Sequence, residues 1–173
     1  MMMPKVGLIS ESLIDLDFND VSGLLLTDLE KVPPHIGLVH NGCYYSATAN
    51  GTILDRKMSL VIDVITKKNK KVLFALFNFK LDVAVLKNTF IDYGALMNGK
   101  TCLYPAKTCI EKSTGLHFNV NFVFELLPQM SKKNLISNYY HFLLETHLDN
   151  GFYTLSTYKK SDIIACIDRL TNK

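Results

Sequence analysis

A cysteine and a histidine in this chain stand in settings that suit nucleophilic catalysis. Cys102 follows Thr101, whose hydroxyl can cap a new helix, so the thiol falls in the first turn of that helix. Unpaired amides and the helix dipole favour the thiolate there, which is the reactive form of cysteine. His35 enters an apolar run directly after Pro33 and Pro34. We expect His35 to be the base that removes the thiol proton of Cys102.

The elements around these two residues are predicted from local signals. Residues 35–40 and 43–48 are predicted to be strands joined by Asn41-Gly42, because this dipeptide provides the positive φ angles of a tight hairpin turn. Residues 101–113 are predicted to form the helix that presents Cys102. The hairpin and this helix must therefore pack together if the imidazole is to reach the thiol.

A third polar group is needed to orient the imidazole of His35. Ser46 and Thr48 are the best-placed candidates, because both lie on the second hairpin strand beside His35. Neither is a carboxylate or an amide, which are the usual orienting groups. Two further residues of this strand are predicted to line a substrate groove, namely Tyr44 and Tyr45.

The remaining cysteines and histidines are given no chemical role. Cys43 and Cys166 are interpreted as structural, and His40 is expected to face solvent at the hairpin tip. No pair of cysteines has the spacing of a zinc site, so no metal and no cofactor are predicted. No role is assigned to three other histidines, His117, His141 and His147.

The composition suits one folded domain. The chain has 173 residues, of which 48% are hydrophobic and 20% charged, and we expect a single α+β domain over residues 1–173. The net charge of +3 is too small to indicate nucleic-acid binding, and the lysine run at residues 67–71 is interpreted as a solvated turn. No signal peptide or membrane span is recognised, so a cytoplasmic protein is expected, with export by another route left open.

Hydrophobic periodicity predicts the rest of the chain. The order of these elements is typical of an α+β fold without internal repeats. The predicted elements are strands at residues 21–26, 72–79, 116–127 and 152–157, helices at residues 54–66, 81–97 and 131–148, and a last helix capped by Ser161.

The segment His35-Ile36-Gly37-Leu38-Val39, with Thr101-Cys102 opening a later helix, resembles the circularly permuted NlpC/P60 papain-like proteins. In the permuted members the histidine strand precedes the cysteine helix, as it does here. The resemblance covers about residues 20–115. It implies a mainly antiparallel sheet packed against helices, and a cysteine amide or ester hydrolase or acyltransferase that acts on peptides, lipids or other acyl compounds.

Two other classes of function stay open at this point. One is a catalytically inactive binding module on the same fold, which the departure at Ser46 and Thr48 from the family's third residue favours. The other is a structural or phage assembly protein that self-associates as a homo-oligomer. Its interface would contain aromatic residues that the sequence places close together, namely Phe118, Phe122, Phe124, Tyr139 and Tyr140.

Overall fold

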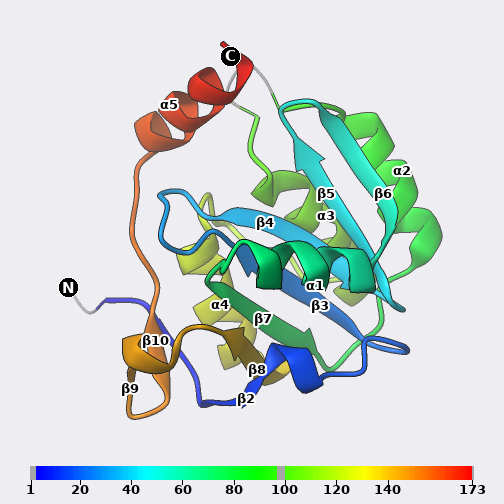
Figure 1. Ribbon diagram of the computed structural model, residues 1–173. Coiled ribbons are helices and arrows are strands. Elements are labelled where there is room, and N and C mark those ends of the chain that lie inside the picture. The colour runs from blue at the N-terminus through cyan, green and yellow to red at the C-terminus, as the bar shows by residue number, and fades with distance from the viewer. Residues whose placement is uncertain (1–2, 97–99, 173) are drawn as a thin grey trace.

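A seven-stranded sheet runs through the computed structural model, which describes residues 3–96 and 100–172 (Figure 1). Its strand order is β2-β8-β7-β3-β4-β5-β6, and all neighbours are antiparallel except β2 and β8. The α+β class and the mainly antiparallel sheet are therefore confirmed. The strands are β2 (Ile9–Ser12), β3 (Ser22–Thr27), β4 (His35–His40), β5 (Cys43–Thr48), β6 (Gly51–Lys57), β7 (Val72–Phe77) and β8 (Ile136–Phe142).

Helices cover both faces of this sheet. One face packs against α1 (Met58–Lys67) and the short 3-10 helix η1 (Leu13–Asp15), as Figure 1 shows for α1. A larger apolar core fills the other face, and four helices contribute to it. These helices are α2 (Val83–Tyr93), α3 (Leu103–Thr114), α4 (Val123–Lys132) and α5 (Lys160–Thr171).

A second, three-stranded sheet joins the beginning of the described chain to residues 148–154. Its central strand β10 (Phe152–Thr154) pairs with β1 (Lys5–Val6) on one side and with β9 (Leu148–Asp149) on the other. The 3-10 helix η2 (Glu145–His147) precedes β9. In the described ranges, no helix has both the length and the apolar character that crossing a membrane requires.

The β4–β5 hairpin is confirmed with the predicted boundaries. Asn41 and Gly42 have φ angles of 46° and 78°, the left-handed values that this turn requires. The predicted central strands are confirmed as well, because β3 is buried along its whole length and β7 along most of it. The local signals of this part of the chain therefore agree with the fold.

Residues 54–57 extend β6 instead of opening the predicted helix. The Tyr45 hydroxyl donates a hydrogen bond of 2.6 Å to Asp55, which ties this segment to β5. The helix α1 begins only at Met58. The apolar spacing suited a helix, but pairing with β5 fixes the strand.

The predicted strand at residues 116–127 is wrong. Its second half belongs to α4, whose first turn is closed by the Glu125 carboxylate, which accepts a hydrogen bond of 3.2 Å from the Phe122 amide. Pro128 lies inside this helix and does not end an element. The alternating apolar residues of the first half remain outside any strand, although Phe118 is fully buried.

The predicted helix at residues 131–148 is also wrong, because its centre forms β8. This strand pairs with β7 along six residue pairs and thereby completes the middle of the sheet. Residues 139–142 read Tyr-Tyr-His-Phe, and aromatic residues favour strands. Pairing with β7 makes residues 136–142 a strand. Local hydrophobic periodicity carries no information about this long-range pairing.

Three predicted helix boundaries change. The helix at residues 81–97 is shorter, since α2 ends at Gly94 with a φ of 71°, and the predicted stop at residues 98–99 lies outside the described residues. The cysteine helix begins one to two residues later than predicted, although it does end at Gly115. Ser161 is not the cap of α5, because the Asp162 carboxylate instead accepts a hydrogen bond of 2.7 Å from the Lys159 amide.

Two of the five aromatic residues of the proposed self-association surface are buried, and the other three are half-buried. Phe118 and Tyr139 are buried, and Tyr140 is half-buried and lies against Phe74. Phe122 and Phe124 stack on each other with ring centroids 5.0 Å apart. The burial of Phe118 and Tyr139 takes these two residues out of the proposed interface, whereas the half-buried Phe122, Phe124 and Tyr140 leave self-association a prediction.

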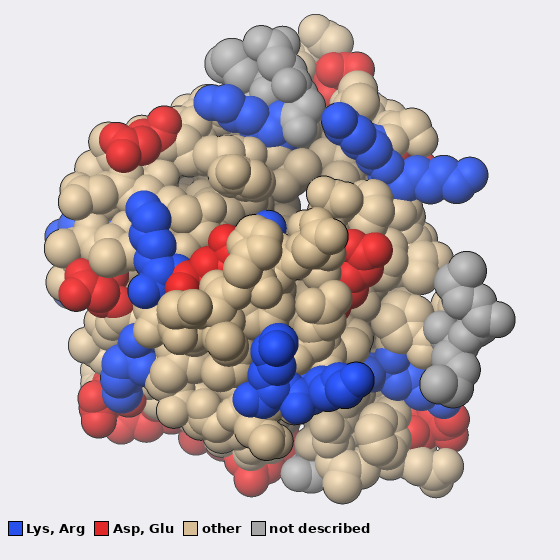
Figure 2. Space-filling model, turned by 180° about the vertical axis from the view of Figure 1, so that it is seen from behind, with Lys and Arg blue, Asp and Glu red and all other residues tan. Residues whose placement is uncertain are grey.

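Charged side chains do not form one dominant patch on the face shown in Figure 2. Basic and acidic groups are interspersed there with uncharged residues. One lysine of the run at residues 67–71 is also neutralised, because the ammonium of Lys70 lies 2.9 Å from a carboxylate oxygen of Asp28. The lysine run therefore gives no support to nucleic-acid binding.

Candidate active site

The start of α3 presents Cys102. The Thr101 hydroxyl accepts a hydrogen bond of 3.3 Å from the Tyr104 amide, but the N-cap residue of α3 is Cys102 and not Thr101. Cys102 therefore stands immediately before the first helical turn, and not inside that turn as the sequence predicted. Pro105 is the third helical residue, where a missing N–H costs no helical hydrogen bond. The helix packs against α2 and β4, so Cys102 comes to lie beside the beginning of β4.

His35 is held by Ser46. The Nε2 atom of His35 lies 2.5 Å from the Ser46 hydroxyl, and Ser46 is fully buried. The hydroxyl can accept a hydrogen bond from Nε2–H, and in that tautomer Nδ1 is the ring nitrogen without a proton. The structure therefore supports Ser46 as the group that orients the imidazole.

Thr48 does not take this role. Two residues beyond the last pair of the β4–β5 register, Thr48 would stand opposite His35. Its hydroxyl instead donates to the Gly51 carbonyl at 2.7 Å and accepts from the Asn50 amide at 3.2 Å. The hydroxyl thus closes the turn between β5 and β6. Of the two predicted orienting residues, only Ser46 contacts the imidazole.

Tyr44 and Gly37 support the same face of the hairpin. A Cβ atom on Gly37 would lie 2.3 Å from Cε2 of Tyr44, so the tyrosine ring lies directly over the glycine. Tyr44 is buried, which raises the pKa of its phenol, while a hydrogen bond from Ser46 lowers it. The Tyr44 phenol and the His35 imidazole therefore both bond to the Ser46 hydroxyl.

The predicted substrate groove does not include the two tyrosines. Tyr44 and Tyr45 are both buried, and neither lines the cavity that contains Cys102. The Tyr45 ring instead packs 6.5 Å from that of Phe90 on α2. Both side chains support the sheet from within.

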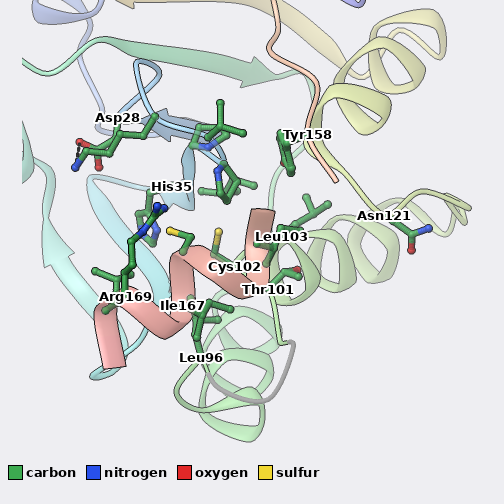
Figure 3. A pocket seen from close by; sticks show the side chains of 18 residues that line it. Asp28, His35, Leu96, Thr101, Cys102, Leu103, Asn121, Tyr158, Ile167 and Arg169 are labelled. Carbon is green, nitrogen blue, oxygen red and sulfur yellow. Dashed lines mark ion pairs between the residues drawn. The ribbon is translucent and has the colours of Figure 1, made fainter. Parts of the chain in front are cut away.

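The cavity that contains Cys102 and His35 has a volume of about 640 Å³ (Figure 3). This size falls in the range of small-molecule sites. The lining comes from the segment before β4, the start of α3 and one side of α5, and it is mainly apolar. Its apolar members are Val32, Pro33, Pro34, Ile36, Leu96, Leu103, Ile163, Ile167 and Leu170.

Burial keeps both reactive groups neutral. It lowers the pKa of His35 from 6.5 to about 4, an effect that the Asp28 carboxylate opposes and the Lys70 ammonium reinforces. Burial likewise raises the pKa of the Cys102 thiol to about 11, although the backbone amides of Ile36 and of Cys102 itself act in the opposite direction. The expectation of a resting thiolate at the helix start is therefore wrong, because desolvation outweighs the amides.

No hydrogen bond joins the Cys102 thiol to the His35 imidazole in the described part of the chain. His35 belongs to the sheet face that also carries Val39 and Tyr44, whereas Ile36 faces α3. The two groups share the cavity because His35 stands at the first residue of β4, at the rim of the sheet. Hydrogen bonds of this kind often form only when substrate binds.

The contribution of α5 was missed by sequence reasoning. Cys166, interpreted above as structural, lines the cavity together with Arg169, and its charge affects the pKa of Cys102. The apolar spacing of Ile163 and Ile167 was recognised, but the side of the sheet on which this last helix packs was not predictable from the local pattern. The resemblance also ends near residue 115.

The prediction for His40 is corrected. Its side chain is buried, and its Nδ1 lies 2.8 Å from the hydroxyl of Ser22, which also accepts a hydrogen bond from the Leu81 amide. His40 therefore joins β4, β3 and the segment before α2. It does not face solvent at the hairpin tip.

No protein-family model, curated protein or solved structure matches this chain. The described residues also contain no cluster of three or more His, Cys, Asp or Glu side chains that is arranged to hold a metal ion.

Proposed function

We propose that this chain is a cysteine-dependent acyl hydrolase or acyltransferase of the permuted NlpC/P60 type, with Cys102 as the nucleophile and His35 as the base. The observation that carries the proposal is the shared cavity. It brings Cys102 from α3 and His35 from β4 together, and it leaves Nδ1 of His35 available because Ser46 bonds to Nε2. The order of the two elements in the chain agrees with the permuted arrangement.

The reaction follows from the positions of these groups. His35 accepts the thiol proton at Nδ1 while the sulfur of Cys102 attacks the acyl carbon of an ester, thioester or amide. Backbone amides at the start of α3, including that of Cys102, stabilise the oxyanion. The imidazolium then protonates the leaving group, and the C–S bond is cleaved by water or by an amine or alcohol acceptor.

The free protein holds a neutral thiol and a neutral imidazole in this account. The Ser46 hydroxyl orients the ring but carries no charge to stabilise an imidazolium, and burial disfavours both ions. Proton transfer therefore accompanies attack on the substrate and does not precede it. A substrate that fills the mainly apolar cavity displaces water, which strengthens the hydrogen bonds to the oxyanion.

An inactive binding module is the second candidate. The high pKa of Cys102 and the absence, within the described residues, of a thiol–imidazole hydrogen bond favour it. In that case the cavity would bind a ligand, and Cys102 would serve only as part of the apolar wall.

Turnover of activated acyl compounds distinguishes the two candidates. We expect the protein to hydrolyse p-nitrophenyl esters or acyl thioesters, with the acyl chain length varied from two to twelve carbons. Cys102→Ala should abolish turnover. Cys43→Ala is the matched control, because Cys43 is half-buried on β5 and does not line the cavity. Turnover by the Cys102→Ala variant at the wild-type rate would contradict the proposed cysteine-dependent activity. The absence of turnover by the wild type across the whole series would contradict it as well.

A further inference from the structure

The helix α5 forms one wall of the cavity and brings a cation to it. Ile163, Ile167 and Leu170 line this wall at helical spacing and are apolar, and Arg169 stands next to them. Figure 3 shows the Arg169 side chain running from α5 toward His35. An exposed guanidinium group therefore stands at the mouth of a cavity whose lining is mainly apolar.

The acidic group at the same mouth is already neutralised. Asp28 accepts hydrogen bonds of 2.9 and 3.1 Å from Lys70, and Lys31 lies 3.9 Å from the same carboxylate. Arg169 has no ion pair with any carboxylate of residues 3–96 and 100–172. The charge balance at the mouth is therefore positive, and Arg169 is its unpaired component.

We propose that Arg169 binds an anionic group of an amphiphilic substrate, either a carboxylate or a phosphate, while the apolar chain of the substrate lies along α5. This inference rests on the proposed function and names the substrate class of the same site. A guanidinium suits the role because its planar N–H groups bind two oxygens at once. The Arg169 contact fixes one end of the molecule, so its acyl carbon is presented to Cys102.

The neighbouring residues agree with an amphiphile. The apolar lining matches a chain that avoids water, and the volume of about 640 Å³ accommodates a molecule of moderate size. A neutral substrate would leave the guanidinium without a partner when the chain displaces water from the mouth. An anionic group replaces the lost water as a hydrogen-bond partner of the guanidinium, so Arg169 selects substrates by their charge and not by their chain length.

Binding is measured on the Cys102→Ala protein, which prevents turnover. The probes are decanoate, decyl phosphate and decanol below their aggregation concentrations, titrated by isothermal titration calorimetry. We expect both anions to bind at least about tenfold more tightly than decanol, which corresponds to about 1.4 kcal/mol. A preference for decanoate or for decyl phosphate tells which anionic group the site takes.

Arg169→Gln should abolish the preference for anions and leave decanol binding unchanged. Lys159→Gln is the matched control, because it removes the same charge beside α5 at an exposed residue that does not line the cavity. Equal affinity for decanol and the anions, or a preference that survives in Arg169→Gln, would overturn the proposal. Anion-selective binding without any acylation of Cys102 in the wild type would support the proposed anion site at Arg169. The same result would contradict the proposed catalytic function.

Discussion

The imidazole Nε2 of His35 and the hydroxyl of Ser46 lie 2.5 Å apart, and Ser46 is fully buried. A neutral hydroxyl thus occupies the place where a carboxylate or an amide usually orients such a ring. The contact fixes the direction of the imidazole without stabilising its charge. This explains why the half-buried His35 can stay neutral and still face the cavity in a defined orientation.

Replacing Ser46 by alanine should destabilise the protein and impair the site. The change leaves Nε2 without its partner, and an unsatisfied buried polar group costs about 1–3 kcal/mol. We expect the free energy of unfolding, measured with urea, to fall by this amount. Turnover should fall as well, but by less than the about 10²–10⁴-fold that a general base contributes, because His35 remains.

Thr48→Ala is the control for Ser46→Ala, since it removes a hydroxyl from the same face of the same strand. Its hydroxyl bonds only to the turn before β6, so the NMR signals of the His35 ring should keep their wild-type shifts. A change of these signals in Thr48→Ala and none in Ser46→Ala would contradict the assignment of the orienting group.

The stability of the protein should decrease between pH 6.5 and pH 4. His35 has its pKa lowered to about 4 in the folded state, whereas the unfolded chain binds a proton near the ordinary value of 6.5. In this window the unfolded state holds more protons, so stability rises with pH and is lost as pH falls. The lowered pKa of His35 corresponds to a loss of about 1.4 kcal/mol in the free energy of unfolding for each pH unit, or about 3 kcal/mol over the whole window.

Urea unfolding of wild type and His35→Gln across this window tests the linkage. The curve of the variant should be flatter by the stated amount. His147→Gln is the control because His147 is exposed, and its curve should follow that of the wild type. Parallel curves for wild type and His35→Gln would rule out a neutral, desolvated imidazole.

Gly37→Ala should be disruptive although alanine is the smallest change. Its Cβ would lie 2.3–2.5 Å from the Tyr44 ring, which is itself buried and has little room to move. We expect a loss of about 1–3 kcal/mol in the free energy of unfolding, as for other overpacked cores. Combining Gly37→Ala with Tyr44→Leu should recover part of this loss, and purely additive effects of the two changes would show that the ring is not the obstacle.

Cys102 should react slowly with iodoacetamide at neutral pH. Burial raises the pKa of its thiol to about 11, so the thiolate fraction is far lower than for an exposed cysteine, and the rate should rise with pH toward that value. Mass spectrometry of the peptide that contains Cys102, at a series of pH values, measures this. A rate that already reaches its plateau below pH 7 would indicate a preformed thiolate and contradict the neutral pair.

Local sequence signals predicted the hairpin but not the C-terminal third. Asn41-Gly42 determines its turn through φ angles that few residues adopt, so no distant contact is needed. In contrast, β8 forms because it pairs with β7, and its partner residues lie 59 to 70 positions away in the chain. The aromatic residues of β8 fitted a helical pattern equally well, and only the long-range pairing distinguishes the two.

The candidate site, like the fold, was predicted where local signals place its residues and not where distant elements pack together. Cys102, His35 and Ser46 are recognisable because a helix start and a strand pair place them by local rules. The helix α5 closes one side of the cavity that contains Cys102 and His35, and its position depends on tertiary packing, so neither the raised pKa of Cys102 nor the presence of Arg169 at the cavity was accessible from the sequence.

Trapping an acyl-enzyme tests the central claim most directly. Wild-type protein and His35→Ala are mixed with p-nitrophenyl octanoate, release of p-nitrophenol is followed in time, and acylated peptides are identified by mass spectrometry. We predict a single octanoyl group on Cys102 of the wild type, formed about 10²–10⁴-fold more slowly in His35→Ala. Acylation at equal rates in both proteins, at Cys166 instead of Cys102, or at no residue would contradict the Cys102–His35 mechanism.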